Sequence, residues 1–236
     1  MENVIYPVRI NRYLALLNIS SRREADEIIK KGLVTVNGRI AKLGDKVNEC
    51  DAVKVNRKKY IKRNLYFAYY KPYGVVTHTS KEGQKSIREV GNFPEGVFPL
   101  GRLDRNSHGL IILTNDGRIT DKLLNPEYEH EKEYLVKINK KVNNFFLKHM
   151  RQGIDLEDFR TKPCKVKEVG TGTFLIALSE GKKHQIRRMC AALDCEVVDL
   201  KRIRIMNIKL GNMKPGEKKI IEGKELKIFL KGLGII

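Results

Sequence analysis

The chain has 236 residues, and its 47 Lys and Arg outnumber its 28 Asp and Glu, giving a net charge of +19. This length suits one large or two unequal domains, and a hydrophobic content of 41% excludes wholesale disorder. The 19 Gly and 7 Pro are scattered, which excludes a collagen-like or low-complexity chain. The charge excess favours a polyanionic partner, because Lys and Arg that neutralise phosphates release condensed counterions.

The sequence gives no sign of export or of insertion into a membrane. No basic segment followed by an apolar run opens the chain, so we expect no secretory signal. Apolar runs such as residues 110–113 are far shorter than the roughly 20 residues that span a bilayer. We therefore expect a soluble cytoplasmic protein.

The cysteines give no metal signature. They form no Cys-x-x-Cys pair, and no His or Cys partners stand at zinc-like spacing. We expect no metal and buried free thiols at Cys50, Cys164, Cys190 and Cys195.

A basic seam over residues 56–64 divides the sequence into two blocks. Residues 1–63 carry 15 Lys and Arg against 7 Asp and Glu, a net charge of +8, so the remaining 173 residues carry +11. Charge per residue is about twice as dense in the first block. We therefore predict a docking module over residues 1–63 and a larger domain over residues 64–236.

The first block is predicted to hold two helices and a hairpin. Apolar residues at helical spacing indicate a helix around residues 10–17. Ser21 and Glu24 form a capping box, which begins a second helix that ends at Gly32. A strand over residues 33–36 leads into Asn37-Gly38, the pair best suited to a tight hairpin turn.

Basic side chains gather in this block. Arg9, Arg22, Arg23 and Arg39 can converge on one surface, although an ordinary solvated helix face gives the same pattern. The order of a helix, a Ser-Arg-Arg helix and a Gly-x-Val-x-Val-Asn-Gly hairpin over residues 8–55 resembles the RNA-binding domain named after small-subunit ribosomal protein four. The resemblance implies binding of structured RNA through its phosphates and shape, with Asn37 on the binding side.

The larger block mixes strands and helices without regular βαβ repeats, which favours an α+β fold on a mainly antiparallel sheet. In chain order, we predict strands over residues 65–70, 74–77, 110–114, 134–138, 164–169, 174–178 and 197–210, and helices over residues 118–124, 183–193 and 225–231.

Three segments of this block could carry chemistry. Asp104 lies between Arg102 and Arg105 on a Gly-containing loop, which suits an ionised nucleophile or general base, or else a structural turn held by ion pairs. A Gly-led basic helix start holds Lys183 and Arg187 at helical spacing, and it could bind phosphate or simply face solvent. Tyr134 heads an apolar strand, where it could fill the core or stack on a base.

Together these segments resemble the RsuA-like family of ribosomal RNA pseudouridine synthases. The resemblance covers nearly the whole chain and rests on several motifs in the right order: Lys71-Pro72-x-Gly74; Phe98 to Asp104 with Ser107-x-Gly109-Leu110 after it; Glu131 to Tyr134; His184 to Met189; and Leu200 to Ile205. It implies the pseudouridine synthase fold and no cofactor.

The resemblance also implies roles for individual residues. The family's catalytic aspartate falls on Asp104, its base-stacking tyrosine on Tyr134, and the basic residue that pairs with the aspartate on Arg187. An apolar pocket residue falls on Leu200. From the matched motifs we expect Arg102 and Gln185 in the substrate pocket, and Lys183 and Arg188 on the RNA.

The implied reaction isomerises uridine to pseudouridine by breaking the N1–C1′ bond, rotating the base and rejoining it through C5. Glu129 to Val136 and Arg202 to Asn207 look closest to the RluF-type branch (RluB, RluE and RluF), which acts on large-subunit ribosomal RNA. Lys183-His184-Gln185 is more like the small-subunit branch. We expect large-subunit ribosomal RNA, free or in an assembly intermediate, as the partner of a monomer. The alternatives are a small-subunit target or a non-catalytic assembly factor.

Overall fold

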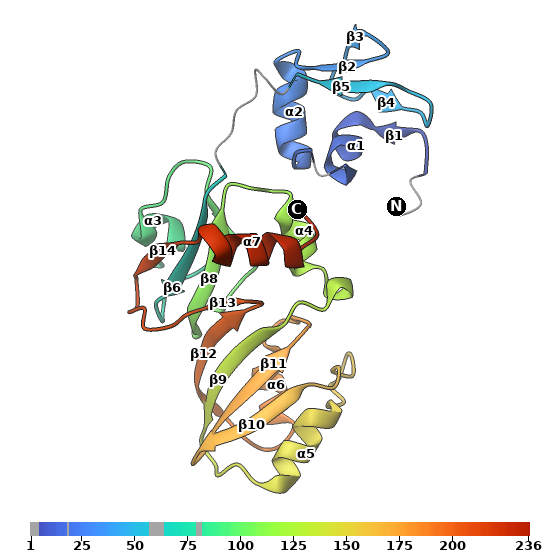
Figure 1. The fold of residues 1–236 in the computed structure, drawn as a ribbon. Helices are drawn as coiled ribbons and strands as arrows, with labels where there is room; N and C mark the ends of the chain where they lie inside the picture. Colours follow the sequence, from blue (N-terminus) through green and yellow to red (C-terminus); the bar gives the residue numbers. More distant parts are fainter. Residues whose placement is uncertain (1–4, 18, 57–63, 79–81) are drawn as a thin grey trace.

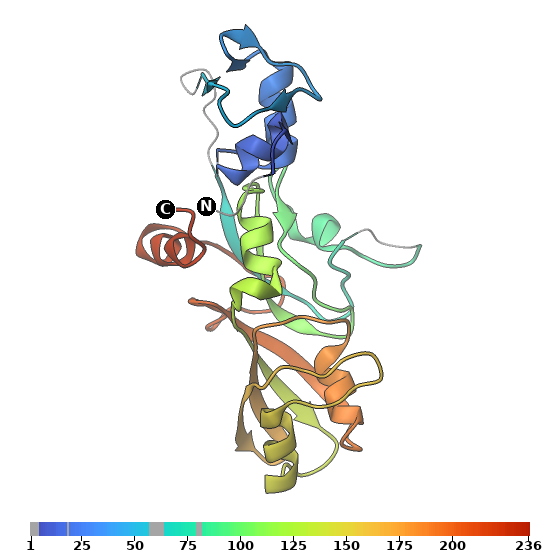
Figure 2. The same ribbon diagram turned by 90° about the vertical axis from the view of Figure 1, so that its right-hand side faces the viewer.

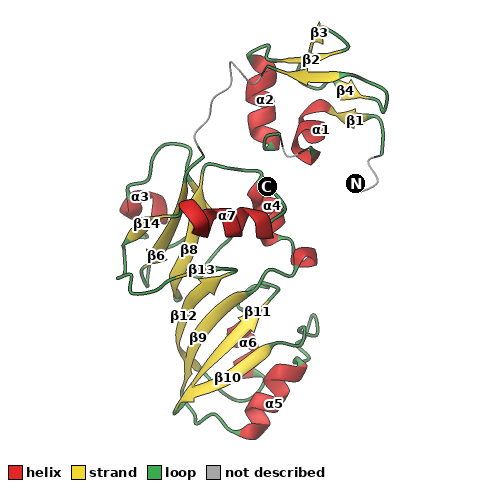
Figure 3. Ribbon diagram, viewed as in Figure 1, coloured by secondary structure: helices red, strands yellow, loops and turns green. Residues whose placement is uncertain are grey.

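A computed structural model describes residues 5–17, 19–56, 64–78 and 82–236 of the chain (Figure 1). A small N-terminal module of helices and short strands precedes a larger domain built on one sheet, as the colouring by secondary structure in Figure 3 makes clear. The basic seam predicted over residues 56–64 lies almost entirely outside the described residues.

The N-terminal module follows the predicted order of two helices and a hairpin. Ser21 caps the second helix, since its hydroxyl accepts from the Glu24 N–H (3.3 Å) and the Glu24 carboxylate accepts from the Ser21 N–H (2.9 Å). Asn37 and Gly38 both have positive φ, +51° and +83°, which closes the tight turn. The elements are β1 (Val8–Arg9), α1 (Ile10–Leu16), α2 (Arg22–Lys30), β2 (Val34–Val36), β3 (Arg39–Ile40), β4 (Lys46–Val47) and β5 (Val53–Val55).

The larger domain is built on a nine-stranded sheet in the order β10-β11-β9-β12-β8-β6-β14, with β13 beside β12 and β7 beside β8. Among the described strands only β8 and β12 pair in parallel, so the predicted α+β fold on a mainly antiparallel sheet is confirmed. The strands are β6 (Tyr66–Lys71), β7 (Phe98–Pro99), β8 (His108–Thr114), β9 (Lys132–Ile138), β10 (Lys165–Gly170), β11 (Thr173–Leu178), β12 (Val197–Ile205), β13 (Ile208–Lys209) and β14 (Lys218–Ile220).

The parallel pairing is a narrow joint between two halves of this sheet. Its ladder consists of two residue pairs, His108 with Lys201 and Gly109 with Arg202. On one side lie β6, β7, β8 and β14, and on the other lie β9 to β12. Figure 2 shows the two halves stacked one below the other beneath the N-terminal module.

Helices cover each half separately. Phe146 of α5 and Met189 of α6 pack on the half formed by β9 to β11, whereas α4 and α7 cover one face of the half formed by β6 and β8, and α3 covers the other. No helix in the described part of the chain is long and apolar enough to cross a membrane. The helices are α3 (Ile87–Gly91), α4 (Ile119–Leu124), α5 (Asn144–Gln152), α6 (Gln185–Ala191) and α7 (Gly223–Gly232), with a 3-10 turn η2 (Pro126–Tyr128).

Two sequence predictions fail here. The strand predicted over residues 74–77 does not form, and only an isolated bridge joins Val76 to Ser86, because the backbone of this segment hydrogen-bonds to a neighbouring loop instead. Cys50 is exposed rather than buried. Cys190 and Cys195 are buried as expected, and burial raises the pKa of the Cys190 thiol to about 12.

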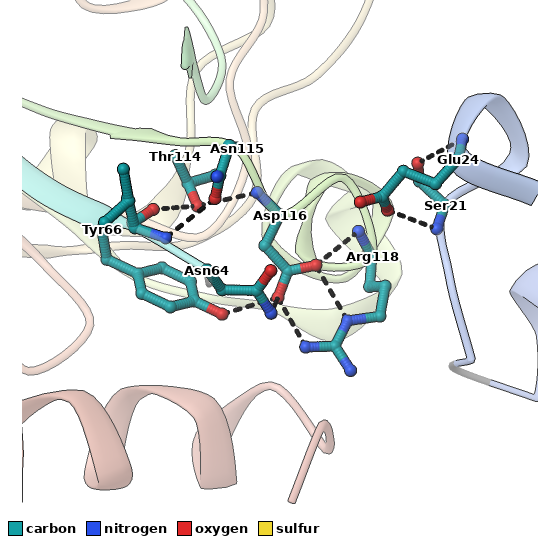
Figure 4. Close-up of polar contacts among 9 residues, drawn as sticks. Ser21, Glu24, Asn64, Tyr66, Thr114, Asn115, Asp116 and Arg118 are labelled. Carbon is teal, nitrogen blue, oxygen red and sulfur yellow. Dashed lines mark hydrogen bonds and ion pairs between the residues drawn. The ribbon is translucent and has the colours of Figure 1, made fainter. Parts of the chain in front are cut away.

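A polar cluster around Asp116 fixes the start of the larger domain (Figure 4). The Asp116 carboxylate, 1% exposed, accepts from the Tyr66 hydroxyl (2.6 Å), the Asn64 amide (3.2 Å) and the Arg118 guanidinium (2.7 and 2.8 Å). A Cβ at Gly117 would lie 2.5 Å from the Ser21 Cβ. Gly117 is therefore a point of close approach between the two parts of the chain, and a side chain there would clash with Ser21.

Candidate active site

Asp104 lies on a loop between β7 and β8 whose backbone is fixed from several directions. The Thr77 hydroxyl donates to the Leu103 carbonyl (2.7 Å) and accepts from the Leu103 N–H (3.0 Å). The Gly74 N–H donates to the Arg105 carbonyl (2.9 Å), and the Ser107 N–H donates to the Asp104 carbonyl (3.0 Å). The segment that failed to form a strand thus holds the residues on both sides of Asp104.

A row of residues in register crosses the sheet beneath this loop. Tyr134 of β9 pairs with Arg202 of β12, Arg202 pairs with Gly109 of β8, and Gly109 pairs with Lys71 of β6. Neighbours in register share a face of the sheet, so Tyr134, Arg202 and Lys71 lie on one face, and Leu200, two residues before Arg202, joins them. Gly109 has a φ of +104°, and a Cβ there would lie 2.3 Å from the Arg202 carbonyl oxygen, so only glycine lets β8 and β12 approach this closely.

One pocket of about 410 Å³ collects residues from both halves of the sheet. A larger cavity of about 630 Å³, beside α3, is lined by none of the predicted site residues. The smaller pocket is the site candidate because it brings six of the predicted site residues together: Arg102, Asp104, Tyr134, Lys183, Gln185 and Leu200.

The predicted ion pair between Asp104 and Arg187 is not formed. The Arg187 guanidinium donates to the carbonyls of Asn106 (2.6 Å) and Val197 (3.1 Å), so it ties the Asp104 loop to β12 rather than facing the carboxylate. The side chain opposite the carboxylate is His184, whose Nε2 lies 3.8 Å from the Asp104 Oδ1. Residue spacing could not separate these outcomes, because the long Arg187 side chain reaches several acceptors from one position on α6.

Gln185 lines the pocket, but its amide is used inside the protein. Its Nε2 donates to the buried Glu180 carboxylate (2.6 Å), and its Oε1 accepts from the Lys182 N–H (3.0 Å). These bonds hold the turn before α6, in which His184 adopts a left-handed conformation with φ of +54°. Such a conformation is strained for a residue other than glycine, and here it lies where His184 faces Asp104.

Two buried cations that the sequence analysis did not assign lie beneath the pocket. Lys71, 0% exposed, donates to the carbonyls of Pro72 (3.0 Å) and Val75 (2.7 Å). Arg202, 4% exposed, donates to the Leu110 carbonyl (2.6 Å). Neither forms an ion pair among the described residues. Burial, together with the charge of Arg202, lowers the pKa of Lys71 to about 8, while the charge of Asp104 opposes this shift.

The predicted RNA-binding residues differ in how free their side chains are to contact RNA. Arg9, Arg22 and Arg23 are exposed on the N-terminal module, and Lys183 is exposed beside the pocket. Arg39, although exposed, pairs with Asp45 (2.8 Å). The remaining two are engaged within the protein: the Asn37 amide bonds to Asp51 (2.8 Å) and Ala52 (2.8 Å), and Arg188 pairs with Asp158.

Comparisons with known proteins identify the family to which each part of the chain is similar. The family model described as RNA pseudouridylate synthase matches residues 65–192, and that of the S4 domain matches residues 8–59. The chain is 41% identical over 199 residues to the Escherichia coli (strain K12) dual-specificity RNA pseudouridine synthase RluF, covering 83% of this chain and 69% of that protein. It is 37% identical over 204 residues to the Bacillus subtilis (strain 168) ribosomal large subunit pseudouridine synthase B, covering 82% and 84%.

A solved structure extends the match to almost the full length. The crystal structure of a pseudouridylate synthase superimposes with a TM-score of 0.69 at 28% identity, covering 96% of this chain and 99% of that chain. The predicted family and the predicted N-terminal RNA-binding domain are therefore confirmed. The chain belongs to the RNA pseudouridylate synthase family, as an RsuA-like enzyme with an N-terminal S4 domain.

Proposed function

We propose that this enzyme isomerises one specific uridine of large-subunit ribosomal RNA, with Asp104 as the nucleophile. Residues 64–236 carry out the reaction, and residues 1–63 dock the RNA. Similarity to the Bacillus subtilis protein, a ribosomal large subunit pseudouridine synthase, supports this choice of target. The observation that carries the proposal is the pocket itself, in which Asp104, Tyr134 and Leu200 come together from three separate segments.

The pocket suits a single extruded nucleoside. Flipping a uridine out of structured RNA costs a few kcal/mol, and stacking on the Tyr134 ring returns about 1–3 kcal/mol. Leu200, buried on the same face of the sheet, supplies an apolar wall. The exposed Lys183 and Arg102 at the pocket are available for the flanking phosphates.

The reaction needs a carboxylate beside the glycosidic bond. Asp104 attacks either C1′ of the ribose or the base ring, and the electron pair of the broken N1–C1′ bond passes to the uracil. After the base rotates, C5 bonds to C1′, Asp104 is released, the C5 proton is lost and N1 gains a proton. The reaction needs no oxidant and transfers no phosphoryl group. We further propose that the enzyme is a monomer that acts on ribosomal RNA or a subunit assembly intermediate in the cytoplasm.

The test is pseudouridine mapping by carbodiimide labelling and primer extension. Large- and small-subunit ribosomal RNA, and assembly intermediates from a strain lacking the protein, are incubated with the wild type or with Asp104→Asn. A new large-subunit site seen only with the wild type is the expected result. A new pseudouridine in small-subunit RNA would show that the target lies in the small subunit. A pseudouridine made by Asp104→Asn would show that Asp104 is not the nucleophile. No site on any substrate would favour a binding factor.

A further inference from the structure

Ser107 lies one tight turn after Asp104. Its N–H donates to the Asp104 carbonyl (3.0 Å), so the two residues share one backbone turn at the head of β8. Ser107 is 0% exposed and yet lines the pocket that contains Asp104. Ser107 therefore belongs to the inner wall of the pocket rather than to the protein surface.

The Ser107 hydroxyl has no hydrogen-bond partner among the described residues. A buried hydroxyl without a partner is disfavoured, because it loses its bonds to water and gains nothing in return. The other side-chain atoms of this kind belong to Asn11, Ser20, Arg202 and Asn207. Of these residues only Ser107 lines the Asp104 pocket, so a molecule bound in the pocket can supply the missing partner.

The turn does not need this hydroxyl for its shape. Thr77 already holds the Leu103 peptide through two hydrogen bonds, and Arg187 holds the Asn106 carbonyl. The backbone bond from Ser107 to Asp104 closes the turn without its side chain. A hydroxyl that is buried, unpartnered and unnecessary for the local fold is explained best by a bound group.

We propose that the Ser107 hydroxyl binds the target uridine through an oxygen beside its glycosidic bond, either the ribose 2′-hydroxyl or the uracil O2. The inference rests on the proposed function. Asp104 must reach C1′ or the base ring, and both oxygens lie within two bonds of the N1–C1′ bond. A group on the same turn as Asp104 is suited to fix the nucleoside at that position. A hydroxyl can donate to either oxygen or accept from the 2′-hydroxyl.

The experiment compares full-length wild type, Ser107→Ala and Ser20→Ala on an RNA fragment that contains the mapped uridine. Ser20 is the matched control, since its hydroxyl is also buried and has no partner in the part of the chain that the structure describes, but it lies in the S4 domain. Two further fragments carry 2′-deoxyuridine or 2-thiouridine at the target. Single-turnover rates are measured for each protein on each fragment. For any fragment that is not converted, the equilibrium affinity is measured by fluorescence anisotropy. Melting temperatures are recorded for all three proteins.

We expect Ser107→Ala to slow conversion of the uridine fragment about tenfold, the effect of losing one hydrogen bond, and Ser20→Ala to keep the wild-type rate. Neither variant should melt lower than the wild type, because each loses a hydroxyl without a partner. The Ser107→Ala penalty should vanish on whichever modified fragment lacks the contacted oxygen, which identifies that oxygen.

Three results would overturn the inference while leaving the proposed function intact. In the first, Ser107→Ala converts the uridine fragment at the full wild-type rate. In the second, Ser107→Ala lowers the rate by the same factor on all three fragments. In the third, Ser107→Ala lowers the melting temperature and Ser20→Ala does not. A wild-type protein that converts no uridine in the fragment would overturn the proposed function and this inference together.

Discussion

The S4 domain and the catalytic domain use positive charge in opposite ways. In the S4 domain Arg9, Arg22 and Arg23 are exposed to solvent. In the catalytic domain Lys71 and Arg202 are buried beneath the pocket and donate to backbone carbonyls. The first arrangement leaves cations available to a polyanion, whereas the second fixes cations in a place that no phosphate can reach.

This difference separates two contributions to activity. Exposed cations act on RNA through phosphates, so their effect weakens as salt screens it. Buried cations are screened much less, and the charge of Lys71 depends on pH rather than on ionic strength. Variants in the two regions should therefore respond to different variables: salt concentration for the exposed arginines and pH for Lys71.

Asp104→Asn should lower the single-turnover rate about 1000-fold or more while leaving RNA affinity within about twofold. The amide has nearly the same shape but is not a nucleophile. Rates are measured by pseudouridine mapping, and affinity by filter binding at several salt concentrations. A salt dependence of binding that changes with this substitution would contradict the assignment of docking to the S4 domain.

Tyr134→Ala should slow conversion about 30-fold, because the ring would no longer stack on the extruded base. Tyr134→Phe keeps the ring and should stay within about threefold of the wild type. The single-turnover rates of the two variants are compared with the wild-type rate. If Tyr134→Phe is as slow as Tyr134→Ala, the hydroxyl rather than the stacking face matters.

Replacing Arg22 and Arg23 with Ala should weaken RNA binding about tenfold and reduce the slope of log affinity against log salt by roughly 1.4 to 1.8, which is about 0.7 to 0.9 for each phosphate that is no longer neutralised. Arg39→Ala should do less, because Arg39 already pairs with Asp45. RNA affinities of the double variant and of Arg39→Ala, measured over a series of salt concentrations, make the comparison. An unchanged slope in the double variant would place docking outside this surface.

The smallest effect concerns pH. Because the pKa of Lys71 is lowered to about 8, this side chain is charged at pH 7 and neutral at pH 9.5. The wild-type rate should fall about threefold over that interval as Asp104 loses a neighbouring positive charge. Lys71→Met should be slower at pH 7 and lack this step. If the rates of the two proteins fall by the same factor between pH 7 and pH 9.5, the charge of Lys71 does not affect Asp104.

Much of the fold was predictable because local signals decided it. The Ser21 capping box and the Asn37-Gly38 turn form as predicted, since each depends on residues only one to three positions apart. The helix α5 was not predicted, although Asn143 caps it and Phe146 and Met150 bury its inner face. That signal was present in the sequence and was missed.

The site was predictable in its residues but not in all its contacts. Asp104, Tyr134 and Leu200 line one pocket, as the motifs indicated. The partner of Arg187 could not be read from spacing, because the choice between a carboxylate and a carbonyl depends on how β12 meets the Asp104 loop. The same applies to Lys71 and Arg202, which become neighbours only when three strands come into register.

The joint between β8 and β12 has a consequence for how the enzyme is made. The pocket is lined by Asp104 from one half of the sheet and by Leu200 from the other, 96 residues later in the chain (200 − 104). The S4 domain precedes the catalytic domain in the chain, and domains generally fold as units in the order of synthesis. A nascent chain thus completes its S4 domain before its pocket, and a product that ends before β12 lacks Leu200 and with it one wall of the pocket.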